Sequence, residues 1–147
     1  MLAAIKQFLG KSPEERVKID PKLAVAQLLL EMTRADYAAD ASEIAMVRQL
    51  LARAYSLDDE ALDALLKEAG EHLSRSISLY DVVNALNAVT GQDERRQLLG
   101  MLWRVAYADG VLDKYEEALL RKLSDLLFVP HSDFIREKLA AMEGREG

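Results

Sequence analysis

The chain has 147 residues, half of them apolar, and its 25 acidic and 19 basic residues give a net charge of −6. This length fits one domain with its own core, and the absence of cysteine excludes disulfides and thiolate metal ligands. The negative charge disfavours nucleic acid, which proteins bind through a concentrated basic face, and favours metal cations or basic proteins as partners.

No apolar run reaches the roughly 18 residues that a membrane-spanning helix needs, and residues 1–10 lack the apolar run of a secretory signal. We therefore expect a soluble, cytoplasmic protein without a membrane span. Alanine, leucine, glutamate, lysine and arginine dominate, and only 6% of the residues are aromatic. This composition is typical of an all-helical domain.

Residues 1–19 are predicted to hold a short amphipathic helix followed by a polar joint. The apolar residues of this helix lie at helical spacing: Leu2, Ile5, Phe8 and Leu9. A membrane-surface anchor is one interpretation, but such helices are usually longer and more basic, and up to residue 11 only Lys6 and Lys11 are positive. Packing against the domain is the better interpretation.

Residues 20–142 are predicted to form the folded domain. Asp20 followed by Pro21 is a strong helix start, because a cap aspartate accepts hydrogen bonds from free backbone amides and proline at the first position loses none. Apolar residues then recur at helical spacing between breaks. They predict helices over about 21–34, 42–55, 58–70, 78–89, 92–108 and 130–142, and a further helix that Asp113 opens. Residues 143–147 are expected to be a frayed tail.

Part of the chain repeats at an offset of 73 residues (109 − 36). Three pairs of acids match: Asp36 with Asp109, Asp40 with Asp113, and Glu43 with Glu116. Apolar residues also match: Leu50 with Leu123, Tyr55 with Phe128, Leu62 with Ile135, and Leu66 with Leu139. We therefore predict an internal duplication of a three-helix unit, 20–70 and 92–139, around a shared core that contains Trp103. The fold class is then an all-α, single-domain bundle of about eight helices.

Helix capping is the first interpretation of the acidic residues. Asp113 with Glu116, and Asp40 with Glu43, each have the spacing of a capping box, in which two side chains satisfy free amides at a helix start. Gly110 fits a left-handed residue that ends the preceding helix. On this interpretation the two acidic turns are corners between helices, and the chain is a structural protein–protein interaction domain.

A divalent-cation site is the second interpretation, and the residues leave both open. Asp109, and Asp36 with it, is expected at the C-terminal end of a helix, where the helix dipole disfavours negative charge. If the flanking helices pack antiparallel, Asp109 converges with Asp113 and Glu116. Three carboxylates at such short distances repel one another unless a cation lies between them. Sites made only of oxygen ligands select Ca²⁺, Mg²⁺ or Mn²⁺.

The known motifs of calcium loops and enzymes do not account for the pattern. An EF-hand has glycine at position six and glutamate at position twelve, whereas counting from Asp109 the glycine is second and the twelfth residue is Leu120. There is no glycine-rich phosphate loop and no histidine pair with metalloprotease spacing. His131 near Ser132 and Asp133 is better explained as a helix start. We expect a protein that is not an enzyme.

The duplicated acidic pattern resembles the TerB-like family of tellurite-resistance-associated helical proteins, in particular a bacterial branch of it. The similarity covers about residues 20–139. It is carried by Arg34-Ala35-Asp36 with Asp40 and Glu43, and by Ala108-Asp109-Gly110-Val111-Leu112-Asp113 with Glu116.

The resemblance implies an all-helical bundle with a divalent-cation site. Its candidate ligands in this chain are Asp36, Asp40, Glu43, Asp109, Asp113 and Glu116. The resemblance also implies a role in tellurite or chemical stress and a protein partner, with membrane-associated assemblies among the family's settings. The chain departs from the family pattern at Tyr37, which stands where the second turn has Gly110. Because a left-handed conformation is costly for a bulky residue, we expect the second turn to be the better cation site.

Overall fold

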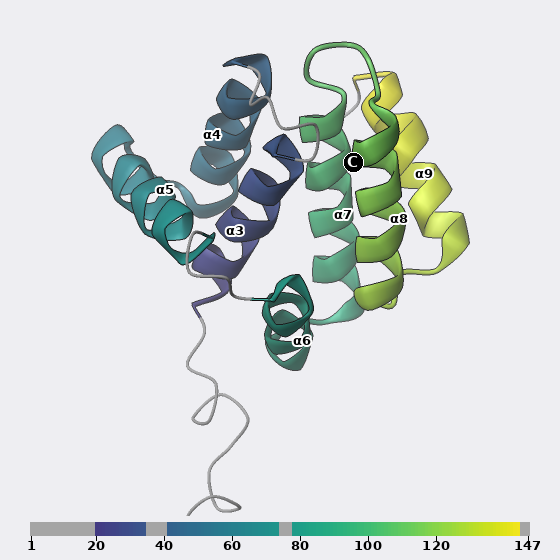
Figure 1. The fold of residues 1–147 in the computed structure, drawn as a ribbon, viewed down its shortest axis with the longest axis horizontal. Coiled ribbons are helices and arrows are strands. Elements are labelled where there is room, and N and C mark those ends of the chain that lie inside the picture. Colours follow the sequence, from purple (N-terminus) through teal and green to yellow (C-terminus); the bar gives the residue numbers. More distant parts are fainter. Residues whose placement is uncertain (1–19, 35–40, 74–77, 145–147) are drawn as a thin grey trace, which may run out of the picture.

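The structure is a computed structural model, and it describes residues 20–34, 41–73 and 78–144. These residues form seven α-helices and no strand, which confirms the all-α prediction (Figure 1). The helices are α3 (Pro21–Thr33), α4 (Ala41–Tyr55), α5 (Asp59–Leu73), α6 (Leu79–Val89), α7 (Gln92–Ala106), α8 (Lys114–Leu126) and α9 (His131–Met142). The helix predicted in residues 1–19 lies outside the described residues. No helix in the described ranges is long and apolar enough to cross a membrane.

Two predicted helix ends can be compared with the structure. Asp20 is the N-cap of α3, and its carboxylate accepts a hydrogen bond from the backbone N–H of Lys22 at 3.0 Å, as predicted. Gly70, in contrast, does not end its helix, because α5 continues to Leu73. Gly70 is exposed, and a helix tolerates a glycine there at a cost of about 1 kcal/mol.

Helix α3 is buried on nearly every side. All residues from 23 to 29 are buried, including the polar Gln27, which is 4% exposed. A helix without a polar face is stable only when other helices surround it. Accordingly, α3 packs against α4, α5, α6 and α7, and it lies beside α7 in the middle of the bundle (Figure 1).

Helix α7 packs against α3, α4, α8 and α9, and therefore joins the two sides of the bundle. Trp103, predicted to belong to the core, is fully buried on α7. Its ring meets that of Phe134 on α9 edge-on, with 5.0 Å between ring centres, and stacks on Tyr107 at 5.9 Å. Such aromatic pairs contribute about 0.5–1.5 kcal/mol beyond the area they bury.

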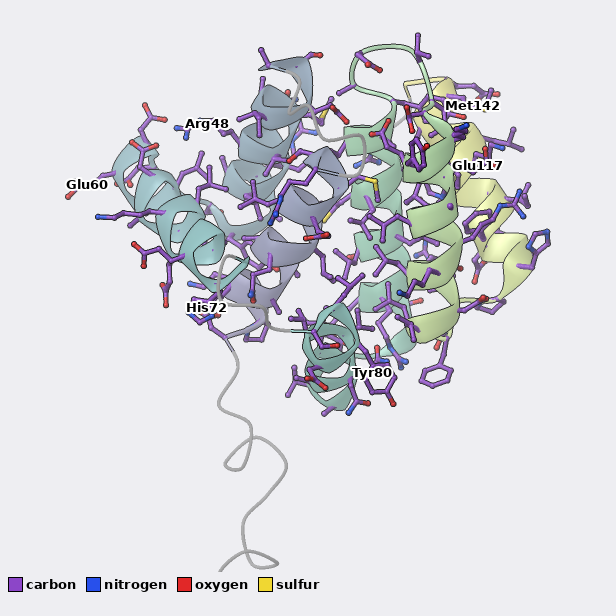
Figure 2. All side chains as sticks on the ribbon, viewed as in Figure 1. Arg48, Glu60, His72, Tyr80, Glu117 and Met142 are labelled. Atoms are coloured by element: carbon purple, nitrogen blue, oxygen red, sulfur yellow. The ribbon has the colours of Figure 1, made fainter. Side chains whose placement is uncertain are left out.

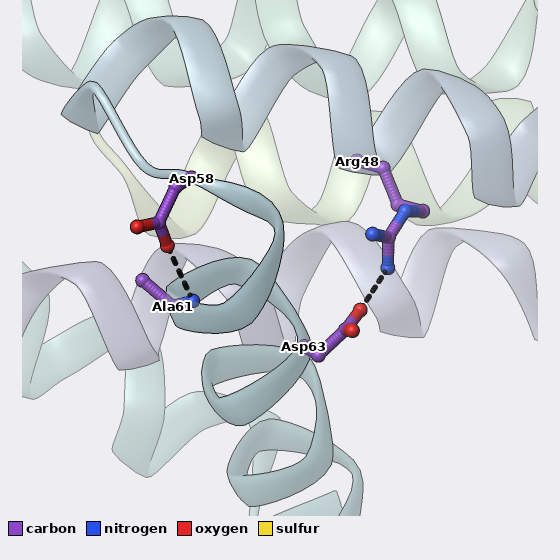
Figure 3. Close-up of polar contacts among 4 residues, drawn as sticks. All are labelled: Arg48, Asp58, Ala61 and Asp63. Atoms are coloured by element: carbon purple, nitrogen blue, oxygen red, sulfur yellow. Dashed lines mark hydrogen bonds and ion pairs between the residues drawn. The ribbon is translucent and has the colours of Figure 1, made fainter.

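The corner between α4 and α5 is fixed by side chains (Figure 3). Ser56 has a φ of 53°, a left-handed conformation, directly after α4. The carboxylate of Asp58 accepts a hydrogen bond from the backbone N–H of Ala61 at 2.8 Å, as a helix cap does. Arg48 on α4 pairs with Asp63 on α5 at 2.8 Å, but both are partly or largely exposed, so this ion pair contributes at most about 1 kcal/mol.

The turn after α8 is held by side chains of α6 and α7. Phe128 has a φ of 57° in this turn and is 69% exposed. Three backbone carbonyls at the end of α8 accept side-chain hydrogen bonds: Leu126 from Asn87 at 2.7 Å, Phe128 from Gln92 at 3.0 Å, and Leu127 from Arg95 at 3.3 Å. These carbonyls have no partner within the helix, so the donors stabilise both the helix end and its position against α6 and α7.

The helix bounds follow the predicted repeat at first and then depart from it. Helices α3 and α7 end 73 residues apart (106 − 33), and α4 and α8 begin 73 residues apart (114 − 41). The left-handed residues Ser56 and Phe128 are 72 residues apart (128 − 56), and so are the first residues of α5 and α9 (131 − 59). The duplication stays a prediction, and its offset is not constant.

Leu62 was predicted to correspond to Ile135, and Leu66 to Leu139, but the residues of these pairs differ in how far they are buried. Leu62 is 3% exposed, whereas Ile135 is 36% and Leu139 is 47% exposed. At an offset of 72, Leu62 matches Phe134, which is also 3% exposed. The offset between corresponding features falls from 73 residues to 72 before α9 begins. Because one residue turns a helix by about 100°, positions paired at an offset of 73 face different sides from there on.

Gly100 allows α9 to lie directly on the backbone of α7. A methyl group placed on Gly100 would lie 2.5 Å from Oε2 of Glu137 on α9. Glu137 is 4% exposed, and its other carboxylate oxygen accepts a hydrogen bond from Arg96 at 2.9 Å. This buried carboxylate therefore has a charged partner and little space in which to move.

We expect Gly100→Ala to destabilise the protein by about 1–3 kcal/mol, because the added methyl group displaces Glu137 from Arg96 in a packed interior. Gly70→Ala is the matched control, since Gly70 is also helical but has no atom within 4 Å of an added methyl group. It should stabilise the protein by about 0.5–1 kcal/mol. Urea unfolding measures both, and equal effects would contradict the close contact at Gly100.

Candidate functional site

The candidate site is the second acidic turn, residues 107–116, which joins α7 to α8 and forms the loop at the top of Figure 1. The first acidic turn falls in residues 35–40, so the candidate ligands Asp36 and Asp40 lie outside the described residues. Their companion Glu43 is in the first turn of α4 and is 1% exposed.

The first half of the second turn closes on its own backbone. Gly110 has a φ of +85°, which confirms the predicted left-handed residue, and its N–H donates to the carbonyl of Tyr107 at 2.9 Å. The carboxylate of Asp109 accepts a hydrogen bond from the backbone N–H of Val111 at 3.0 Å. Asp109 therefore has a structural role, since a short acidic side chain can close a turn by accepting from a nearby amide. Its position at a helix end did not predict this role.

The second half of the turn is a capping box, as predicted. Asp113 is the N-cap of α8, and its carboxylate accepts from the backbone N–H of Tyr115 at 2.6 Å. Glu116 reaches back and accepts from the backbone N–H of Asp113 at 3.3 Å. Two donors at the start of α8 are satisfied in this way.

The three acids of the turn differ in exposure. Asp109 is exposed, Asp113 is half-buried, and Glu116 is 2% exposed. The capping box brings Asp113 and Glu116 together, whereas Asp109 bonds to the turn itself. Within the described ranges, no three aspartate, glutamate or histidine side chains form a group that could hold a metal ion. The proposed ligand set stays a prediction, because two of its members are not described.

Two cations lie beside Glu117, the acid next to Glu116, and neither was predicted to be there from the sequence. The carboxylate of Glu117, which is labelled in Figure 2, accepts a hydrogen bond from Arg121 at 2.9 Å and lies 4.0 Å from the ammonium of Lys138 on α9. The hydrogen bond from Arg121 lowers the pKa of Glu117. Burial, with the charge of Glu117, raises the pKa of Tyr107. Spacing on α8 could have indicated Arg121, but nothing local in the sequence indicates Lys138.

A hollow of about 240 Å³ lies beside the start of the turn. It is open to solvent between α4 and the C-terminal ends of α7 and α9, and its walls include Leu50, Arg53, Arg104 and Tyr107. The sequence carries no signal for it, because its residues come from three helices that only the folded chain brings together.

His131 has a packing role in the structure. It is the first residue of α9, as expected for a residue at a helix start. Its ring stacks on that of Phe134 with 5.8 Å between ring centres. Asp133 pairs with Arg136 within the same helix at 3.7 Å. These contacts agree with the interpretation of this segment as a helix start.

The family model described as "Tellurite resistance protein TerB" matches residues 22–139, which is most of the chain and all seven described helices except the ends of the first and the last. Neither the search of curated proteins nor the search of solved structures finds a match. The matched region includes all six acids of the two turns.

We expect Gly110→Ala to destabilise the protein by about 1–2 kcal/mol, because an L-residue with a side chain is strained at positive φ. An added methyl group at Gly110 would meet no atom within 4 Å, so the loss would be conformational and not steric. Gly110→Asn is the matched control and should lose clearly less, since asparagine tolerates the left-handed region. Chemical denaturation measures both, and equal losses would contradict the conformational explanation.

Proposed function

The chain belongs to the TerB tellurite-resistance family, and we propose that it is a cytoplasmic, non-catalytic helical domain that acts by binding a protein partner. In this proposal the acidic turns are structural corners of the bundle. The family setting suggests that such a partner belongs to a membrane-associated assembly of the tellurite or chemical stress response.

This proposal rests on the hydrogen bonds that the acids of the second turn accept. Asp109, Asp113 and Glu116 each accept a hydrogen bond from a backbone N–H of the same turn. A side-chain cap of this kind typically contributes about 1 kcal/mol. These acids therefore have a sufficient reason to be present without a cation.

Exposed apolar side chains support a protein partner. Seven large apolar side chains are exposed among the described residues: Tyr80, Val111, Tyr115, Phe128, Ile135, Leu139 and Met142. Single exposed apolar residues are ordinary, but neighbouring ones on a single helix form a surface that a partner can cover. Three of the seven lie on α9.

The second candidate is a divalent-cation module that binds Ca²⁺, Mg²⁺ or Mn²⁺. The left-handed Gly110 favours it, because this glycine reverses the chain between Asp109 and Asp113 without strain. The candidate ligands are Asp109, Asp113, Glu116, Asp36, Asp40 and Glu43. A hard cation prefers about six oxygen ligands, so the acids of the second turn would need carbonyls, water or the first turn to complete the set.

Metal titration separates the two candidates. If the acids only cap helices, calcium, magnesium and manganese at millimolar concentration should each leave the melting temperature unchanged. Asp113→Ala should then cost about 1 kcal/mol with or without metal. A bound cation would instead raise stability with concentration, by about 2.7 kcal/mol at one hundred times its Kd. A saturating rise that Asp113→Ala abolishes would overturn the capping proposal.

If any cation does stabilise the protein, we expect the second turn to hold it. Asp109→Asn should then remove most of the cation-dependent stabilisation, and Asp36→Asn should remove little. The reason is that Gly110 reverses the chain without strain, whereas Tyr37 stands at the matching position of the first turn. Calorimetric melting with and without the cation measures both variants. Equal losses would show that the two turns form one shared site.

A further inference from the structure

Helix α9 carries apolar residues on two faces. Phe134 is 3% exposed and faces the core, where it meets Trp103. Ile135, Leu139 and Met142 are 36%, 47% and 55% exposed. These three residues, the α9 stripe, are spaced by four and then three positions, which places them on one side of a helix in the spacing of a helix–helix seam.

The neighbouring helices of the chain do not account for the α9 stripe. α9 packs on α7, which it meets through Glu137 over Gly100 and through Phe134 beside Trp103. On the side of α8, the ammonium of Lys138 lies 4.0 Å from Glu117 and 5.7 Å from the ring centre of Trp103. Lys138 lies beside the stripe, three residues after Ile135 and four before Met142, but its charged end reaches toward Glu117 on α8. Figure 1 shows α9 at the outer edge of the bundle.

Two charged residues flank the stripe in a self-complementary arrangement. Arg136 lies three residues before Leu139, and its side chain is 70% exposed although it pairs with Asp133 at 3.7 Å. Glu143 lies four residues after Leu139 and is exposed at the end of α9. In two antiparallel helices related by a two-fold axis at Leu139, each Arg136 therefore comes beside the partner's Glu143.

We propose that two copies of the chain associate through α9, antiparallel, with the two-fold axis at Leu139. Each α9 stripe then covers the other, and Ile135 packs near the partner's Met142. The proposal rests on the proposed function, because it names a second copy of the chain as a binding partner. With three apolar anchors from each copy, the interface is small, so the dimer should be weak and in exchange with the monomer.

Cysteine cross-linking tests the geometry directly, because the natural chain contains no cysteine. Leu139→Cys should form a disulfide-linked dimer under mild oxidation, since only a residue at the two-fold axis meets its own copy. The matched control is Tyr80→Cys, at a 57% exposed position on α6. Leu139→Cys should cross-link at least about tenfold faster than the control, as expected when binding raises the effective concentration. Equal rates would overturn the proposal.

Charge substitutions test the antiparallel pairing in the full chain. Sedimentation equilibrium should show a concentration-dependent dimer, and Arg136→Glu should weaken it by about tenfold, because it faces like charges across the seam. Arg136→Glu combined with Glu143→Arg should restore the affinity to within about threefold of the original. Far-UV circular dichroism checks that each variant is folded.

A protein that stays monomeric at every concentration up to about 1 mM would overturn the proposal. Its association free energy would then be weaker than about −4 kcal/mol. The α9 stripe would then have a different occupant, such as the apolar N-terminal segment of the chain. A dimer that the double charge variant fails to restore would overturn the antiparallel arrangement. Neither outcome bears on the metal titration, so failure of this dimer and failure of the capping proposal are distinguishable.

Discussion

The burial of α3 is the constraint on which the rest of the bundle depends. Residues 23–29 are all buried, so this helix has no face that water can solvate. It is stable only because α4, α5, α6 and α7 enclose it, and their positions follow from that requirement. α7 supplies the largest side chain of the fully buried core, Trp103, and carries the packing onward to α8 and α9.

If the predicted duplication holds, the loss of one residue before α9 accounts for the apolar side of α9 that faces outward. Up to the start of α8 the two halves match at an offset of 73, and from the left-handed Phe128 onward they match at 72. A shift of one residue turns a helix by about 100°. Ile135 and Leu139 match the inward-facing Leu62 and Leu66 in the sequence, yet they are 36% and 47% exposed. The core of the second half is completed instead by Phe134 and by the pair of Glu137 with Arg96.

Local patterns in the sequence predicted those features of the fold that neighbouring residues determine. Helical periodicity gave the seven described helices to within a few residues, and the Asp113–Glu116 spacing gave the capping box, because both are decided within one or two turns of chain. What sequence reasoning missed depends on contacts between distant segments. The pairing of Arg96 with Glu137 and the approach of Lys138 to Glu117 join residues on different helices. Gly70 was misread because glycine ends many helices, but an exposed glycine inside a well-packed one is tolerated.

The acids of the second turn suit two roles, helix capping and cation binding. Asp109 looked unsuited to a structural role, since helix dipoles disfavour negative charge at their C-terminal ends. The hydrogen bond from Val111 offsets that cost, because the amide beyond a left-handed glycine points back toward the carboxylate. A cation at this turn would compete with that amide and with those that Asp113 and Glu116 accept. Its attraction to the carboxylates would therefore have to exceed what these three hydrogen bonds contribute.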